Sequence, residues 1–448
     1  MRADSKPASL IYIMKEYIDV LPTNVNQVQS VSYRNGNPLV EFKIGAQERY
    51  LLGSTIRING QLSVTKAGGN VSPAVGDKIV MDARLGVFAC IDQLVVSSSK
   101  TSQTIEHIKN YNTMLSTYLP TTSSPQDLIG HMGVTGLSAA NVTASLTQVT
   151  TVPSNVTPNG ETGGSSFSIP LPCGLFLGQN PIPLSDAWGV KGLNIQIFLA
   201  PDSAVLFSSD GGASAVDSYY SIRNLHLTAE VQSPSPDQLS QLVRQPNHSY
   251  DYNSISGFYA TIQNSYATIN FQLGLKRVLA FWASFIRSSH INNYHFNSFS
   301  RQDIRDGASH SPIKEVFFTR DAIRFPQEYI MTTVQHADPD VKHGEDPQIT
   351  RNFLNSVSPF TKLRRTTVSP YNTPGTSQPD LDLPDGGNIF GIGCALDVIS
   401  NQGVDYSNSQ FGLVVNSELA GDNPQSVFVF VHAKQSLLMN ASGIQVLS

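Results

Sequence analysis

Charged residues are scarce in this chain. Lys, Arg, Asp and Glu make up 14% of its 448 residues, whereas an average soluble domain has roughly 25%. Ser, Thr, Asn, Gln and Gly fill the loops and the outward strand positions instead. A surface with so little charge predicts that neighbouring subunits cover much of it.

The positive charge that nucleic-acid binding requires is also missing. The formal net charge is −5, and the densest basic cluster is Lys362, Arg364 and Arg365. A protein that neutralises many phosphates needs a basic groove or a basic arm. We therefore expect no direct binding of nucleic acid.

Cysteines, long apolar runs and targeting signals are equally rare. Cys90, Cys173 and Cys394 are widely spaced in or beside apolar segments, a pattern that predicts buried thiols rather than a disulfide framework or a metal knuckle. No run of about 18 apolar residues occurs, so no membrane-spanning helix is predicted. The first residues lack the apolar core of a signal peptide, which predicts an intracellular product.

Common catalytic motifs are absent as well. The chain has no GxSxG elbow, no phosphate-binding P-loop, no HExxH, and no GxGxxG between a strand and a helix. We therefore predict that the protein is not an enzyme. The sequence nominates no catalytic, cofactor-binding or metal-ligating residue, and no cofactor.

Two histidine groups and two tryptophans are weak candidates for binding. The loop 336–346 holds enough oxygen and imidazole groups for a divalent cation, but its spacing matches neither an EF-hand nor a zinc site, so we expect a solvated loop. His290 and His295 fit a plain transition from strand to loop. Trp282 lies in an apolar run and is predicted to be core, whereas Trp188 precedes a glycine and is a candidate exposed platform for a sugar ring.

Apolar and polar residues alternate with a period of two over much of the chain. Ile56, Ile58, Leu62 and Val64 alternate with polar residues, and successive side chains of a strand point to opposite faces. The rhythm predicts half-buried antiparallel strands in an all-β protein. Strands are predicted at residues 38–45, 55–65, 86–98, 166–176, 193–199, 218–231, 257–273, 277–287, 313–320, 327–335, 389–399, 410–416 and 426–434.

Three segments depart from this rhythm and predict helices. Residues 7–21 carry apolar side chains at helical spacing, which indicates an amphipathic N-terminal helix. Residues 102–118 carry a second, narrower apolar stripe. Near residue 235, Ser235 is suited to cap a short helix whose first residue is Pro236.

The Pro- and Ser-rich stretch 233–249 is the best candidate for a domain boundary. It divides the chain into an N-terminal arm (1–22), a first domain (23–232) and a second domain (250–448). Each domain has about as many strands as an eight-stranded jelly roll needs. The predicted fold is therefore all-β, with two eight-stranded antiparallel jelly rolls side by side and a few short helices.

Several stretches of the sequence resemble one known family. Residues 86–98 and 104–115 are similar to a strand and the following helix of a first barrel, 193–202 and 219–231 to its closing strands, and 388–396 to a strand of a second barrel. The family is that of the double jelly-roll major capsid proteins of the PRD1–adenovirus lineage. The resemblance is closest in character to polinton-like viruses and virophages.

This resemblance implies a major capsid protein without catalysis. Three copies would form a pseudo-hexagonal homotrimeric capsomer that tiles an icosahedral shell beside neighbouring capsomers and minor capsid or penton proteins. The N-terminal helix would contact an internal membrane or a cement protein, and genome contact would be left to other proteins. The chain would be made in the host-cell cytoplasm or nucleus and would reside in the virion.

Two other functions fit the same composition. A receptor- or glycan-binding β-sandwich, such as a spike or an adhesin, would use the long polar loops 120–165 or 336–388. A carbohydrate-active enzyme would need two carboxylates about 5–10 Å apart in one cleft, and the sequence pairs no two carboxylates in this way.

Overall fold

The structure is a computed structural model. It describes residues 15–25, 30–34, 38–66, 79–82, 85–122, 150–151, 165–178, 180–208, 215–299, 313–325, 353, 355–357, 392–396, 402–417 and 425–447.

The described strands before residue 233 form three antiparallel sheets. Two sheets are large, and the small third sheet joins β11, β4 and β7. The strands are β1 (Lys15–Val20), β2 (Leu39–Ile44), β3 (Tyr50–Lys66), β4 (Ile79–Met81), β5 (Ile91–Ser98), β6 (Thr104–Ile108), β7 (Thr150–Thr151), β8 (Ser165–Pro170), β9 (Ile182–Pro183), β10 (Leu193–Leu199), β11 (Phe207–Ser208) and β12 (Ser218–Gln232).

The described strands after residue 246 form two further antiparallel sheets. No sheet mixes described strands from the two sides of this division. The strands are β13 (Asn247–Ile262), β14 (Tyr266–Gln272), β15 (Val278–Arg287), β16 (Ile313–Arg320), β17 (Ile323–Arg324), β18 (Ile392–Ala395), β19 (Gln410–Ser417), β20 (Gln425–Asn440) and β21 (Gly443–Leu447).

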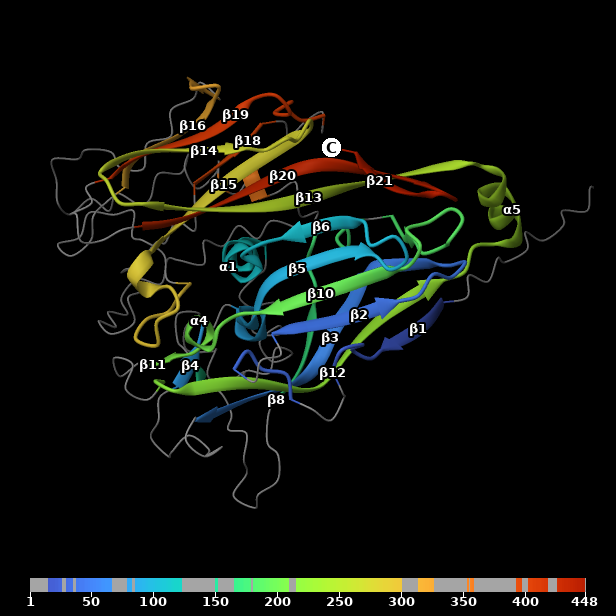
Figure 1. Ribbon diagram of the computed structural model, residues 1–448, viewed down its shortest axis with the longest axis horizontal. Helices are drawn as coiled ribbons and strands as arrows, with labels where there is room; N and C mark the ends of the chain where they lie inside the picture. The colour runs from blue at the N-terminus through green and yellow to red at the C-terminus, as the bar shows by residue number, and fades with distance from the viewer. Residues whose placement is uncertain are drawn as a thin grey trace, which may run out of the picture.

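Both halves of the chain pair their strands in the same order. The strand orders are β1-β12-β3-β8 and β2-β10-β5-β6 in the first half, and β13-β20-β15-β18 and β14-β19-β16-β17 in the second. These orders contain eight strands in each half, which can be numbered from first to eighth along the chain. In both halves one sheet then has the order first–eighth–third–sixth, and the other has the order second–seventh–fourth–fifth. This is the Greek-key order of a jelly roll. The predicted pair of eight-stranded jelly rolls is therefore confirmed, and Figure 1 shows them side by side.

Alternation along each strand separates the core from the outer sheet face. In β3, Ile56, Ile58 and Leu62 are at most 3% exposed, and each such burial contributes roughly 1.5–3 kcal/mol. On the opposite face, the Arg57 guanidinium donates to the Ser168 hydroxyl at 2.8 Å, and the Asn59 amide donates to the Thr228 hydroxyl at 3.0 Å. The outer face of this sheet is therefore polar and hydrogen-bonded across strands.

The helices are few and short. Helix α5 begins at Pro236 after a Ser235 capping box, as predicted, and joins the two halves at one end of the molecule (Figure 1). Helix α1 lies between the halves, and all of its residues from 111 to 119 are buried. The described helices are η1 (Gly86–Cys90), α1 (Tyr111–Thr122), α4 (Asp202–Val205), α5 (Pro236–Arg244) and η2 (Ser288–His290).

The structure corrects both of the longer helix predictions. The N-terminal helix over 7–21 is wrong for Lys15–Val20, which is strand β1 paired with β12; the earlier residues lie outside the described part. Ser102 does not cap a helix, because strand β6 follows it and α1 begins only at Tyr111.

Several predicted strand boundaries also change. Residues 86–90 are the helix η1 rather than the start of a strand. The single strand predicted over 257–273 is the end of β13 followed by β14. The strand predicted over 327–335 falls outside the described residues.

Candidate functional site: the seam between the two jelly rolls

The two jelly rolls meet along strands β6 and β13. We call this contact, together with the residues of both jelly rolls that pack beside these strands, the seam. The hydroxyl group of Tyr252, on β13, donates to the backbone carbonyl of Ile105, on β6, at 2.6 Å. Ile105 is 3% exposed and Ile255 is 1% exposed. The seam is therefore as dry as a domain core and carries specific polar contacts.

A buried carboxylate on β6 binds backbone groups from both jelly rolls. Glu106 Oε1 accepts from the amides of Gly174 at 3.0 Å and Ile255 at 3.1 Å, and Oε2 accepts from the amide of Leu175 at 2.9 Å. The residue is 4% exposed. Burial raises the pKa of the Glu106 carboxyl, and these three amides oppose the rise. One side chain thereby satisfies three buried backbone donors.

Two glycines allow the backbones to approach each other across the seam. A methyl group on Gly174 would lie 1.7 Å from the carbonyl oxygen of Asn253, and one on Gly257 would lie 2.5 Å from that of Lys109. Both distances are far below van der Waals contact. Any side chain at either position would therefore push the jelly rolls apart.

Helix α1 contributes the apolar part of the seam. Trp282, on β15, is fully buried, and its Nε1 donates to the hydroxyl of Thr117 at 3.2 Å. Its ring lies 5.5 Å from that of Phe430. The core of the first jelly roll continues through these aromatic rings into the second, which also has its own core around Phe281 and Phe411.

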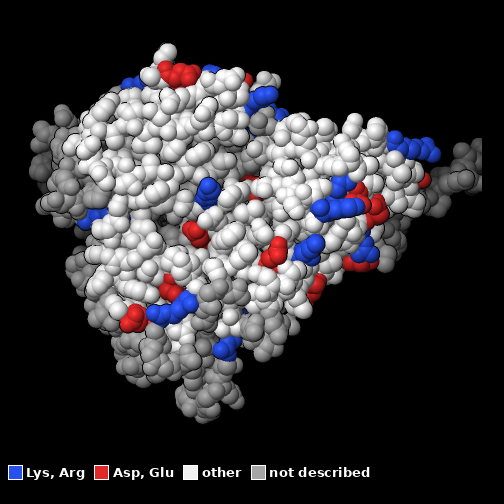
Figure 2. Space-filling model, in the orientation of Figure 1, with Lys and Arg blue, Asp and Glu red and all other residues white. Residues whose placement is uncertain are grey.

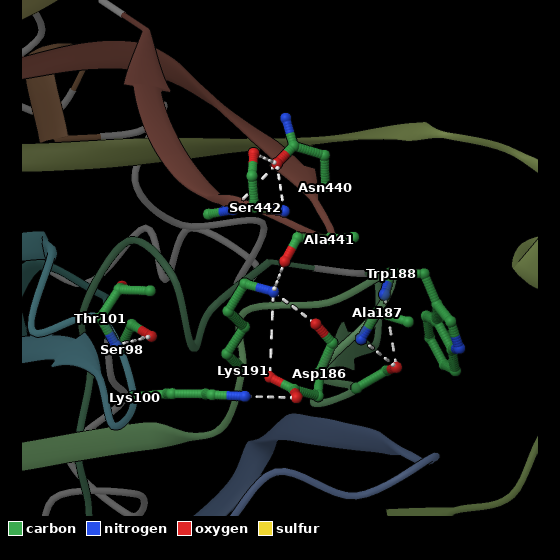
Figure 3. A network of polar contacts seen from close by, with 12 residues as sticks. Ser98, Lys100, Thr101, Asp186, Ala187, Trp188, Lys191, Asn440, Ala441 and Ser442 are labelled. Carbon is green, nitrogen blue, oxygen red and sulfur yellow. Dashed lines mark hydrogen bonds and ion pairs between the residues drawn. The ribbon is translucent and has the colours of Figure 1, made fainter.

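A buried lysine joins the C-terminal hairpin to the first jelly roll (Figure 3). Lys191 is 3% exposed, and its Nζ donates to the carbonyl of Ala441 at 3.0 Å and to the carbonyl of Asp186. The Asp186 carboxylate lies 3.8 Å from Nζ and also pairs with Lys100 at 2.5 Å. The Lys100 hydrogen bond lowers the pKa of Asp186. Carbonyls and a carboxylate together compensate the buried ammonium.

The segment after β15 forms the opposite end of the contact. The hydroxyl of Tyr294 donates to the carbonyl of Ser218 at 3.0 Å, and the amide of Asn297 donates to Asp82 Oδ2 at 2.8 Å. Nearby in the first jelly roll, burial raises the pKa of Asp202 to about 6 against the opposing hydrogen bond from the Tyr220 amide. Polar contacts therefore hold the two jelly rolls together at both ends of the seam.

The residues singled out by the sequence do not form a binding site. Trp188 is 1% exposed and packs on Tyr50 at 5.1 Å, so the suggestion of an exposed platform is wrong. His290 is buried and stacks on Phe296 at 4.4 Å. Trp282 is buried, as predicted. The loop 336–346 lies outside the described residues, among which no group of three or more His, Cys, Asp or Glu side chains is placed to hold a metal.

Sequence reasoning missed Glu106 and Lys191. Glu106 follows Ile105 and precedes His107 in a strand of mixed polarity, so nothing in the sequence marks it as buried, and Lys191 lies in a connecting segment without any signal. Cys90, Cys173 and Cys394 are buried, as predicted. Within the described part of the chain, no helix has both the length and the apolar character needed to span a bilayer.

The face of the molecule in Figure 2 carries little charge. Figure 2 shows one face of the molecule on which Lys, Arg, Asp and Glu side chains lie singly or in small mixed groups, with wide uncharged areas between them. A basic patch of the kind that tracks a nucleic-acid backbone is not visible among the described residues on this face.

Comparison with solved structures identifies proteins of the same fold. The Faustovirus major capsid protein matches with a TM-score of 0.59 and 10% identity over 98% of this chain and 92% of its own. A chain of the Sputnik virophage structure matches with a TM-score of 0.55 and 12% identity over 100% and 91%. The mavirus major capsid protein matches with a TM-score of 0.51 and 10% identity over 100% and 92%. No family model and no curated protein sequence matches the chain. The chain therefore has the double jelly-roll fold of these viral proteins along its whole length.

Proposed function

We propose that this chain is the major capsid protein of an icosahedral virus and resides in the virion. The observation that carries the proposal is the strand order, which is repeated in two jelly rolls joined by a buried seam. The likeness in fold covers 92% of the chains of two major capsid proteins. The low charge of the surface supports burial against further copies. The proposal assigns no catalytic activity to the chain.

The capsomer is a pseudo-hexagonal homotrimer in this proposal. Each chain supplies two similar wedges, so three chains supply a ring of six jelly rolls. Neighbouring capsomers and minor capsid or penton proteins are the further partners, and direct contact with the genome is not expected. The alternative of a receptor- or glycan-binding β-sandwich would use the loops 120–165 or 336–388, most of which lie outside the described residues; the separate candidate for a sugar platform, Trp188, is buried.

The domain division belongs to the same proposal. Residues 23–232 and 250–448 are the two jelly rolls and 233–249 is their linker. Residues 15–20 join the first jelly roll because β1 pairs with β12. The segment before β1 is proposed to contact an internal membrane or a cement protein.

Size-exclusion chromatography with light scattering tests the proposal. The purified chain is expected to run at three times its mass of 48.6 kDa at micromolar concentration, because obligate interfaces bury roughly 2,000–5,000 Å². Negative-stain micrographs should show six-cornered particles. A stable single chain at these concentrations would contradict the proposed function.

A further inference from the structure

Helix α5 has an apolar stripe that belongs to neither core among the described residues. Leu239, Leu242 and Val243 lie three and four positions apart, so their side chains share one face of the helix. No residue of α5 is buried, and Val243 is 64% exposed. We call these three residues the α5 stripe.

A helix as short as α5 needs support from another part of the protein. Isolated helices shorter than about 12 residues are marginal in water, and α5 has nine. The Gln238 amide donates to the Ser235 hydroxyl at 3.2 Å in the capping box, and the His248 ring bonds to the carbonyl of Leu242 at 3.0 Å. Both contacts engage the backbone of the helix, and neither covers the α5 stripe.

The N-terminal segment of the chain enters the fold beside α5. Strand β1 begins at Lys15, which pairs with Gln232. Gln232 is the last residue of β12 and precedes Pro236, the first residue of α5, by only four positions. The chain before Lys15 therefore starts from the end of the molecule where α5 lies (Figure 1).

This segment carries a strongly apolar run next to that point. Residues 10–14 are Leu-Ile-Tyr-Ile-Met, directly before Lys15, and they lie outside the described residues. Five residues span at most about 17 Å, and the nine residues of α5 span about 14 Å. The run is therefore long enough to cover the α5 stripe without any slack from the first nine residues.

We infer that residues 10–14 lie along the α5 stripe of the same chain. The occupant is the same chain because Lys15 fixes one end of the run beside the helix, and a short tether gives an effective concentration of about a millimolar or more. The contact covers two apolar surfaces that water would otherwise reach. It does not rest on the proposed function: it describes the chain before any membrane or cement protein competes for the segment.

Proteolysis of the full chain tests whether the run is covered. Chymotrypsin cleaves after Tyr12, and mass spectrometry identifies this cut. The cut should be at least tenfold slower in the parent than in a synthetic peptide of residues 1–20. Val243→Lys should restore fast cleavage, since it puts an ammonium on the α5 stripe while Lys favours helix more than Val does. Gln241→Lys, on the opposite face of α5, is the matched control and should cleave like the parent.

Hydrogen exchange gives the reciprocal readout on the helix. When Ile11 and Ile13 are both changed to Lys, the amides of α5 should exchange at least tenfold faster than in the parent. Ser5→Lys adds a charge to the same segment outside the apolar run and should leave the exchange of α5 unchanged. Thermal unfolding of each variant checks that the jelly rolls are folded.

Cysteine cross-linking identifies the chain that supplies the run. Ile11→Cys combined with Val243→Cys should form a disulfide within one chain, at least tenfold faster than Ile11→Cys with Gln241→Cys. The native cysteines Cys90, Cys173 and Cys394 are buried and should not compete. Non-reducing electrophoresis separates a product within one chain from a product of two chains.

Three results would overturn the inference. They are cleavage after Tyr12 in the parent at the rate of the free peptide, equal cross-linking of residues 241 and 243, and a product that consists mainly of two linked chains. The proposed function is tested separately, because the contact forms within one chain. A parent that runs as a single chain would contradict the capsomer but not this contact.

Discussion

Glu106 is expected to couple the unfolding of the two jelly rolls. In Glu106→Ala, the amides of Gly174, Leu175 and Ile255 lose their shared acceptor inside the seam. A buried donor left without a partner costs about 1–3 kcal/mol. Three such donors amount to a loss of about 3–6 kcal/mol, allowing for partial relaxation.

The two tryptophans allow each jelly roll to be followed separately. Trp188 lies in the first and Trp282 in the second, both are buried, and the chain has only these two. Urea unfolding is measured by fluorescence and by circular dichroism in Trp188→Phe and Trp282→Phe backgrounds at matched protein concentration, because assembly makes stability depend on concentration. Within each background the fluorescence transition is compared with the circular-dichroism transition, since Trp282→Phe also removes the hydrogen bond to Thr117. With Glu106 intact the two transitions should coincide, whereas in Glu106→Ala they should separate.

Conservative substitutions grade the effect. Glu106→Gln keeps one acceptor oxygen but turns an NH₂ group toward at least one of the amides, so a loss of about 1–3 kcal/mol is expected. Glu41→Gln is the control, since Glu41 lies in a half-exposed network with Asn194 and Gln196, and should cost less than about 1 kcal/mol. If Glu106→Ala stayed within about 0.5 kcal/mol of the parent with coincident transitions, the assigned role of the carboxylate would be wrong.

Three further variants test the fold and the seam. Burial raises the pKa of Asp202 from an ordinary 3.8 to about 6. The folded state therefore favours the protonated carboxyl, and this stabilisation of about 3 kcal/mol is complete below about pH 4 and is lost as the pH rises through 6. Asp202→Asn should remove this pH-dependent loss of stability in thermal scans from about pH 4 to 8. Gly174→Ala should strongly destabilise the seam in the same unfolding assay. Gly443→Ala should be neutral, because nothing lies within 4 Å of the added methyl group. Equal effects of the two substitutions would contradict the close approach of Gly174 to the carbonyl of Asn253. Ile58→Asp puts a charge into the core and should abolish soluble expression, while Asn59→Asp on the outer face should not.

Strand alternation made most of the sheet structure predictable. Leu193, Ile195 and Ile197 alternate with half-exposed residues in β10 as the sequence indicates. The long buried run in β15 is also predicted, although its burial has two causes. One face of β15 lines the core of the second jelly roll and the other supplies Trp282 to the seam.

Local spacing misled where a neighbouring strand decided the outcome. Residues 15–20 fit a helical stripe, but β12 offers an open edge, and pairing there turns Ile18 and Val20 inward and leaves Tyr17 exposed. Residues 104–108 likewise add to the edge of β5. Hydrogen bonds to an existing sheet outweigh a weak helical preference in both segments.

The seam itself lay beyond sequence reasoning. Glu106 binds amides 68, 69 and 149 positions away, and no pattern in a single sequence marks such partners. The close approach at Gly174 depends in the same way on the carbonyl of Asn253. Local sequence predicts which face of a strand is apolar, but not which distant backbone will lie against it.

The burial of Lys191 and Glu106 makes the contact between the two jelly rolls insensitive to salt concentration. Salt screens the attraction between solvent-exposed charges, with a Debye length of about 10 Å at 0.1 M ionic strength. Buried charges are screened much less. Exposed pairs such as Lys100 with Asp186, 2.5 Å apart, will weaken in concentrated electrolyte, while the hydrogen bond from the buried Lys191 ammonium to the carbonyl of Ala441 persists. The two jelly rolls should therefore stay joined at both low and high ionic strength.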